Sequence, residues 1–450
     1  MPTDTSLPII SRASANGRDA TLRRFGFLHI ALIMLGLLGL IRAGALLIHD
    51  PLLALANSYD QIRYTGCFNI APIRPGVAVD RGNPAAPLRT YGFASKSIGV
   101  CYWTTDLIFT ATVAAGWRLA EQLGSDAQHS VRNLAVLRLL AWLLAGWWST
   151  RVLLRLGRED IALANLAWFA LVAMDPVDTL FLATFYAEPT ALFGAWLAVI
   201  GAVVLMLERS RAVWVVTLIG AALLGGSKYQ HVVLPLLLAL TLVVFAARAG
   251  RRAALAVLVG GILGGGLQLG NTLQHPTLLE DMARLNRADF LLTTLLPHTS
   301  DIHKVAEEFD LEPECISHAG SSVYALTTTI QNACPSVDTW THRQLWNALI
   351  SDPPALVGAI RQAAPMLLPW VPDYLGTVES ADTAPLPTSQ PSLNRAFGSS
   401  TTMVWGLLLL PWVVFVICLI GDASPLVRGF AAMCAFASLT VATIALFGDG

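Results

Sequence analysis

The sequence has 450 residues, of which 55% are hydrophobic and only 13% are charged, and its mean hydropathy is +0.59. Soluble domains carry about 25% charged residues, so this composition excludes an ordinary soluble globular protein and indicates a polytopic membrane protein. The formal net charge of −1 also argues against a nucleic-acid partner.

The N-terminal segment, "MPTDTSLPIISRASANGRDATLRR", is too long and too polar for a cleavable secretory signal. No small-residue cleavage site follows the next apolar run. We therefore expect a cytoplasmic tail over 1–24 and an uncleaved membrane anchor over 25–48.

Further apolar runs along the chain predict more membrane-spanning helices, because crossing about 30 Å of hydrocarbon takes roughly 17–25 apolar residues. The expected fold is thus all-α, with about nine transmembrane helices. After the first, they are predicted near 133–154, 160–177, 189–207, 212–228, 230–247, 253–270, 402–420 and 426–447. The run "GGILGGG" at 260–266 lies inside one of them, where close helix packing explains it better than phosphate binding.

The arginines set the predicted orientation, because cytoplasmic connections carry an excess of Arg and Lys. With a cytoplasmic N-terminus, one side of the membrane receives Arg12, Arg18, Arg23, Arg24, Arg151, Arg155, Arg158, Arg209, Arg211, Arg248, Arg251, Arg252 and Arg428. We expect a multi-pass protein of the bacterial cytoplasmic membrane.

This orientation leaves two long segments outside, 49–132 and 271–401, with interfacial and soluble helices expected in them. The predicted domains are the tail 1–24, a transmembrane module 25–270 that contains the first outer loop, an extracytoplasmic subdomain 271–401, and a C-terminal helix pair 402–450. Apolar residues near 104–123 are interrupted by Arg118 and Glu121. A span there would move the arginines at 151–158 outside, so we expect an amphipathic helix on the outer interface.

Four of the six cysteines lie in the two outer segments, namely Cys67 and Cys101 in the first and Cys315 and Cys334 in the second. Their placement suits an oxidising compartment and one disulfide in each segment. Spacing alone does not fix the pairing, so free thiols remain an alternative.

Polar residues gather at the predicted outer rim in three groups. An ionisable residue at membrane depth costs about 2.5–3.5 kcal/mol on insertion, so it usually faces a cavity or a partner. The groups are "SYDQIR" with Asp60 and Arg63, "MDPVDTLFLATFYAEP" with Asp175, Asp178, Tyr186 and Glu188, and "SKYQHV" with Lys228, Gln230 and His231.

These groups suggest two opposed tasks. A partly buried Asp60 could take a proton from an acceptor hydroxyl, and cations such as Arg63 and Lys228 could neutralise a phosphate. The alternatives are structural: Asp60 would cap a helix or pair with Arg63 three residues on, and Lys228 would extend to the lipid interface.

The layout and several short motifs resemble the GT-C superfamily of membrane glycosyltransferases. The motifs are "LANSYDQIR", "SKYQHVVLPL" and "LNRADFLLTTLLPHTSD", which are similar to bacterial surface-glycan and S-layer hexose transferases, and "FYAEP", which is similar to an "FYSEP" turn. The general layout is also similar to protein mannosyltransferases and aminoarabinose transferases.

The resemblance implies a polyprenyl-phosphate-linked sugar donor, an outer glycan or lipid acceptor, and inversion at the anomeric carbon. Because the cations can carry the phosphate charge, no metal or other cofactor is required. It places the catalytic carboxylate at Asp60 and a second acid at Asp175 or Asp178. Substrate contacts would come from Arg63, Tyr186, Glu188, Lys228, Gln230 and His231.

Two other functions fit a polytopic protein of this kind. A glycan polymerase or ligase would use a diphosphate-linked donor and carry more outer arginines. A transporter or flippase would show repeats and ionisable residues at the bilayer midplane, whereas the ionisable groups here lie at one rim and no repeat is visible.

Overall fold

The computed structural model describes residues 13–50, 52–53, 58–73, 89–95, 97, 99–326, 328–366 and 401–447. Nine helical elements lie where membrane spans were predicted. They are α1 (Ala13–Ile48), α4 (Arg132–Arg155), α5 (Glu159–Trp168) with the π-helical turn η2 (Phe169–Ala173), α7 (Glu188–Leu207), α8 (Arg211–Ser227), α9 (Val233–Phe245), α10 (Ala247–Gln274), α18 (Thr401–Ile420) and α19 (Pro425–Phe447).

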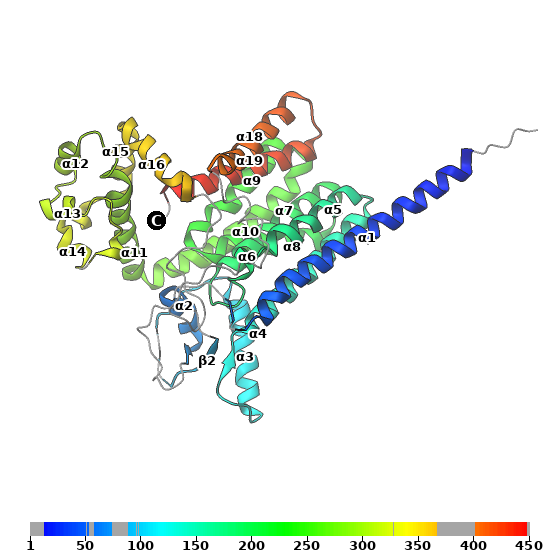
Figure 1. The fold of residues 1–450 in the computed structure, drawn as a ribbon, viewed down its shortest axis with the longest axis horizontal. Coiled ribbons are helices and arrows are strands. Elements are labelled where there is room, and N and C mark those ends of the chain that lie inside the picture. Colours follow the sequence, from blue (N-terminus) through cyan, green and yellow to red (C-terminus); the bar gives the residue numbers. More distant parts are fainter. Residues whose placement is uncertain are drawn as a thin grey trace, which may run out of the picture.

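Within the described residues, three helices are long and apolar enough to cross a membrane, at Phe27–Ile48, Glu188–Leu207 and Arg248–Gln274. Shorter apolar helices cover Arg211–Ser227, Tyr229–Phe245, Trp405–Ile420 and Pro425–Thr440. The chain is therefore a helical membrane protein. Figure 1 shows α1 reaching beyond the other helices at one end of the molecule.

Glycines allow α7, α8 and α10 to pack closely. A Cβ atom at Gly264 of α10 would lie 2.5 Å from the backbone nitrogen of Gly226 in α8, and one at Gly220 of α8 would lie 2.5 Å from the nitrogen of Ala198 in α7. Only glycine, which has no Cβ atom, fits where the helix backbones approach this closely. This explains the "GGILGGG" run as a helix-packing surface.

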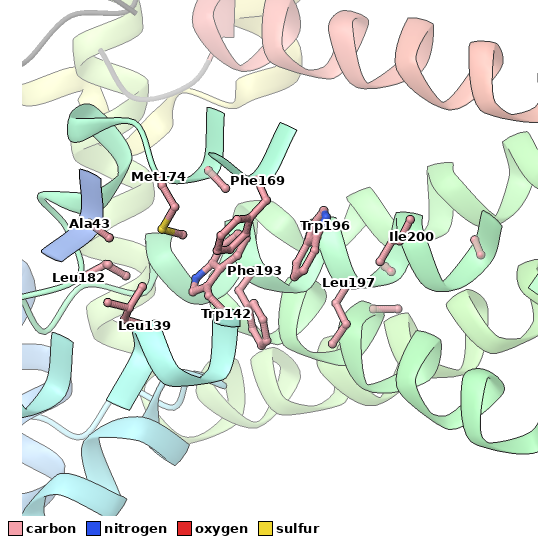
Figure 2. Close-up of a cluster of buried hydrophobic side chains, with 14 of the residues drawn as sticks. Ala43, Leu139, Trp142, Phe169, Met174, Leu182, Phe193, Trp196, Leu197 and Ile200 are labelled. Atoms are coloured by element: carbon pink, nitrogen blue, oxygen red, sulfur yellow. The ribbon is translucent and has the colours of Figure 1, made fainter. Parts of the chain in front are cut away.

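Aromatic rings fill the core between α4, η2 and α7, as Figure 2 shows. The rings of Trp142 and Trp196 stack with centroids 5.2 Å apart, and Phe193 lies 5.1 Å from Trp142. The indole N–H of Trp196 donates to Asn165 Oδ1 over 2.9 Å, so this buried donor is satisfied. These contacts hold the helices whose outer ends carry the acidic turn.

The segment predicted as the first outer loop contains a small three-stranded sheet. Its strands β1 (Ile70–Pro72), β2 (Thr90–Phe93) and β3 (His129–Ser130) pair antiparallel in the order β1-β2-β3. Before them lie α2 (Ser58–Thr65) and the 3₁₀ turn η1 (Gly66–Phe68), and a disulfide joins Cys67 to Cys101.

Helix α3 (Leu107–Gln122) occupies the segment in which an interfacial helix was expected. It buries Val113 and Trp117, while Ile108, Leu119 and Leu123 just beyond its end are 57–78% exposed. In Figure 1 α3 extends away from α7, α8 and α10 instead of lying parallel to them. The arrangement agrees with a helix that presents an apolar side outward.

The second outer segment folds around a hydrophobic core of its own. Because α10 continues to Gln274, this subdomain begins a few residues after the predicted boundary at 271. A disulfide joins Cys315 to Cys334. Its elements are α11 (Pro276–Asp289), η4 (Phe290–Leu295), α12 (Ile302–Glu308), α13 (Pro313–Ser317), η5 (Val323–Ala325), α14 (Ile330–Ala333), η6 (Pro335–Thr339), α15 (His342–Ser351) and α16 (Pro353–Met366).

Candidate functional site

The acidic turn between η2 and α7 contains two aspartates with different surroundings. Asp175 is 1% exposed and forms an ion pair with Arg42 of α1, with Nη2 3.0 Å from Oδ2. The other terminal nitrogen of Arg42 donates to the carbonyls of Ala170 and Leu171. Asp175 therefore fastens the turn to α1, while the assignment of the second acid to Asp175 or Asp178 stays a prediction.

Asp178 lies one helical turn later in α6 (Pro176–Thr179), outside the spans. Its carboxyl group makes no hydrogen bond or ion pair with another described residue. Burial raises its pKa to about 7, the charge of Asp175 adds to the rise, and Arg42 opposes it. Of the two aspartates in the turn, Asp178 is the one with a carboxyl group available for proton transfer near neutral pH.

A buried ion pair that the sequence analysis missed shapes the rest of the turn. Arg138 of α4 places Nη2 2.6 Å from Oδ2 of Asp106, and both side chains are at most 1% exposed. Thr190 Oγ1 donates to the other carboxylate oxygen of Asp106 over 2.5 Å. Arg138 also donates to the main-chain carbonyls of Phe181, Leu182, Thr184 and Tyr186. An arginine inside an apolar helix was a signal for such a partner.

Helix α2 packs on the same turn and so joins the first polar group to the second. Gln61 is 3% exposed, and its Oε1 accepts a hydrogen bond from the main-chain N–H of Phe185 over 2.9 Å. Tyr64 packs with Tyr102 against Ala187, the residue in the "FYAEP" turn where similar turns have serine. The backbone of Asp60 lies in the first turn of this helix, whereas its side chain lies outside the described part of the structure.

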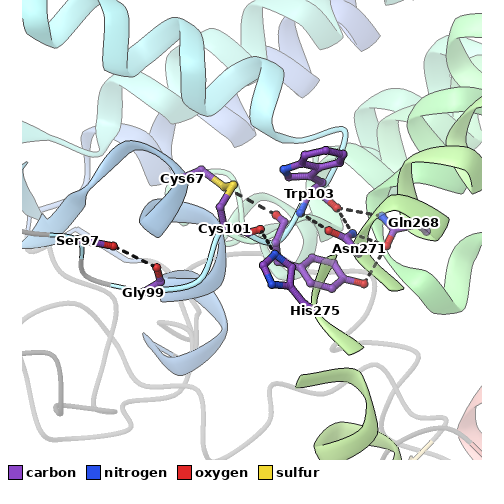
Figure 3. Close-up of a disulfide and its surroundings, with 9 residues drawn as sticks. Cys67, Ser97, Gly99, Cys101, Trp103, Gln268, Asn271 and His275 are labelled. Atoms are coloured by element: carbon purple, nitrogen blue, oxygen red, sulfur yellow. Dashed lines mark hydrogen bonds between the residues drawn. A yellow bond between two sulfur atoms is a disulfide. The ribbon is translucent and has the colours of Figure 1, made fainter. Parts of the chain in front are cut away.

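The segment 101–106 attaches the first outer segment to α8 and α10, as Figure 3 shows in part. Asn271 accepts from the N–H of Trp103 and donates to its carbonyl, both over 2.7 Å. The Tyr102 hydroxyl donates to Gln268 Oε1 over 2.8 Å, and its main-chain N–H donates to the carbonyl of Arg63 over 2.9 Å. Helix α10 thus binds Tyr102 and Trp103, and Tyr102 in turn binds the main chain of α2 at Arg63.

The third polar group lies where α8 ends and the 3₁₀ turn η3 (Tyr229–His231) begins. The Nζ atom of Lys228 donates to Glu188 Oε1 and lies 5.3 Å from the ring centroid of Tyr186. Three predicted site residues therefore meet. His231 Nδ1 instead lies 2.8 Å from Ser227 Oγ, and the Gln230 side chain is exposed.

Tyr102 connects this third group to Arg63. Burial raises the pKa of the Tyr102 phenol, and the charges of Arg63 and Lys228 partly oppose the rise. Both cations consequently lie within electrostatic reach of one hydroxyl group. The structure brings Arg63, Tyr186, Glu188 and Lys228 to one end of the bundle, together with the backbone of α2.

No group of three His, Cys, Asp or Glu side chains suited to a metal ion occurs among the residues that the structure covers. The site is thus composed of carboxylates, cations and aromatic rings. This set can exchange a proton and hold an anion.

Comparison with protein families gives one match. The model described as the YfdI N-terminal transmembrane domain matches residues 113–342, just over half of the chain. Neither the curated proteins nor the solved structures give a significant match. The matched region runs from α3 through the acidic turn and η3 into the outer subdomain.

Proposed function

The chain belongs to the family of the YfdI N-terminal transmembrane domain, and from this premise we propose that it is a membrane glycosyltransferase. It transfers a sugar from a polyprenyl-phosphate carrier to a glycan or lipid acceptor. The reaction takes place at the outer face of the bacterial cytoplasmic membrane and contributes to surface-glycan synthesis.

The proposed topology has nine spans and a cytoplasmic N-terminus. Short connections follow α4, α7 and α9, and the exposed Arg209 and Arg248 and the partly exposed Arg158 lie near them. Positive charge favours the cytoplasmic side for these ends. The opposite ends carry α2, the acidic turn, η3 and the subdomain, all of which then lie outside.

The observation that carries the proposal is the meeting of Lys228, Glu188 and Tyr186 beside Tyr102 and Arg63. Lys228 is 23% exposed and is held in place by a carboxylate and an aromatic ring. A positioned ammonium group and a guanidinium group at the mouth of a helix bundle suit the phosphate of a lipid-linked donor. The apolar polyprenyl chain of this donor would remain in the bilayer.

The reaction follows as a single inverting displacement. Asp60 accepts the proton of the acceptor hydroxyl, and that oxygen attacks the anomeric carbon of the sugar. The bond from this carbon to the phosphate oxygen breaks, and its electron pair leaves with the polyprenyl phosphate. Lys228 and Arg63 stabilise the charge that develops on the phosphate. Asp178 supplies the second carboxyl group of the site.

The decisive experiment uses the purified full chain with polyprenyl-phosphate sugars and acceptor glycans taken from a deletion strain. Asp60→Asn should abolish transfer, by about 10²–10⁴-fold if the carboxylate is the base, and leave the thermal unfolding temperature unchanged. Full transfer by this variant would exclude Asp60 as the base.

The lipid fraction of the same deletion strain identifies the donor. Mass spectrometry should find that a polyprenyl monophosphate sugar accumulates and that the surface glycan lacks one sugar. Accumulation of a diphosphate-linked glycan would point to a polymerase or ligase, and unchanged glycans would count against any transferase.

A further inference from the structure

A cavity lies on the segment between α1 and the start of α4, and neither Lys228 nor Glu188 lines it. It has a volume of about 530 Å³, within the range of about 300–1,000 Å³ that is usual for small-ligand sites. Its walls come from α3, from the connection to β3 and from the start of α4. The polar residues that line it are Ser125, Asp126, Gln128, His129 and Asn133, and the indole of Trp117 forms part of the wall.

The chemistry of these walls restricts the ligand. The amides of Gln128 and Asn133 each offer donors and an acceptor, Ser125 offers both, and Asp126 only accepts. No Lys or Arg lines the cavity, and therefore an anion would face the Asp126 carboxylate without a compensating charge. A purely apolar ligand would leave the polar groups unpaired. A neutral ligand with many hydroxyl groups satisfies all of them.

Trp117 forms the closed part of the cavity wall. Its side chain is 3% exposed, and its indole N–H is buried without a hydrogen-bond partner among the described residues. The imidazole beside it is held in place, since His129 stacks on Trp117 and its Nε2 lies 2.9 Å from Glu121. The polar contacts of a ligand would therefore come from the amide, hydroxyl and carboxylate groups around these rings.

The cavity is linked to the candidate site through two aromatic residues. The ring centroid of Trp117 lies 6.5 Å from that of Phe185. The ring centroid of Tyr91 also lies close to Phe185, at 4.9 Å. Phe185 is the residue whose N–H binds Gln61 of α2. These contacts run through buried side chains, so the cavity wall and the acidic turn share one packed core.

We propose that this cavity binds a neutral sugar unit of the acceptor glycan. Its assignment to the acceptor rests on the proposed transferase function, whereas the binding of a sugar can be measured without any transfer. The hydrogen bonds come from Gln128, Asn133 and Asp126.

The test is saturation-transfer NMR on the full chain in lipid nanodiscs with methyl glycosides of glucose, mannose and rhamnose and with N-acetylglucosamine. At least one glycoside should receive saturation from the wild type. The double variant Gln128→Leu with Asn133→Leu should weaken this binding about tenfold or more, since each lost hydrogen bond is worth roughly a factor of ten.

Gln122→Leu is the matched control, because Gln122 is an exposed glutamine of α3 outside the cavity wall. It should bind as the wild type does. A signal that survives in the double variant would overturn the cavity as the site, and so would the lack of any signal at millimolar glycoside. Saturation of ethanolamine in place of the glycosides would assign the cavity to an amine and also overturn the proposal.

The two proposals can fail separately. Glycoside binding that depends on Gln128 and Asn133, in a chain that transfers no sugar, would retain the cavity and reject the transferase. Transfer at the wild-type rate by the double variant, at limiting acceptor, would retain the transferase and reject this cavity as part of its acceptor site.

Discussion

Arg138 and Asp106 form an ion pair inside the protein, with 2.6 Å between Nη2 and Oδ2 and almost no exposed surface on either side chain. The pair joins α4 to the segment before α3, and through Arg138 it reaches the main chain of the acidic turn. The shape of the candidate site therefore depends on two residues that lie outside the three polar groups.

Replacing Arg138 by methionine should destabilise the fold strongly. Removing one partner of a buried ion pair costs about 3–5 kcal/mol, because the other charge is left buried and unpaired. We expect a lower unfolding temperature in detergent, which fluorescence-detected size exclusion after heating can measure. The double variant Arg138→Met with Asp106→Asn should recover part of this loss, and a double variant less stable than the single one would contradict the pairing.

Lys228→Gln should slow sugar transfer by about 10²–10³-fold, the usual effect of removing one group that stabilises developing negative charge. The rate constant kcat should fall more than the donor affinity, since the charge develops in the transition state. Arg209→Gln is the matched control, because this exposed cation lies just before the other end of α8. Equal effects of the two substitutions would show that Lys228 acts only through net charge.

The pH dependence of stability should report Asp178. Its folded-state pKa is raised to about 7, against about 3.9 for an unfolded aspartate, so the folded protein retains a proton that the unfolded chain releases. The resulting stability is complete below about pH 4 and is lost as the pH rises toward 7. The unfolding temperature of Asp178→Asn should therefore vary less between pH 4 and pH 8 than that of the wild type.

Asp310→Asn provides the control for this experiment, because Asp310 is exposed and Asn tolerates its positive φ of 51°. Its profile should follow that of the wild type. A profile of Asp178→Asn that also follows the wild type would exclude Asp178 as the titrating group.

Loss of the Cys67–Cys101 disulfide should lower both stability and transfer. The bond closes a chain segment with a sequence separation of 34 residues, for which the usual contribution is about 2–4 kcal/mol. Transfer should also fall, because Tyr102 next to Cys101 holds the main chain of Arg63. The measurements are the unfolding temperature and the transfer rate of Cys67→Ser. The control is Cys418→Ser, because Cys418 of α18 is a free cysteine. A Cys67→Ser variant with wild-type transfer would limit the bond to a stabilising role.

Much of the fold follows from the sequence because a membrane imposes a simple rule. Every backbone polar group in lipid must be bonded within its own segment, so each long apolar run predicts a helix. The positions of α4, α7, α8 and α10 follow in this way. The structure pairs Cys67 with Cys101 and Cys315 with Cys334, one disulfide in each predicted segment, although the sequence could not choose this pairing.

The finer features depend on contacts between distant residues, which local patterns do not contain. Asp175 and Asp178 have similar local sequence, and only the position of Arg42 in α1 separates their roles. Asp106 lies in an apolar stretch that gave no sign of its partner 32 residues later. Gln61 reads as a neutral residue between Asp60 and Arg63, yet it is the side chain that fixes α2 to the turn.

Arg138 binds the acidic turn through main-chain carbonyl oxygens and not through side chains. Every amino acid offers such an oxygen, so the path of residues 181–186 can persist while their side chains are exchanged. Because the side chains at 182–186 are themselves buried, the constraint on them is one of volume and packing. Substitutions of similar size there should leave the course of the main chain, and the helices beneath it, in place.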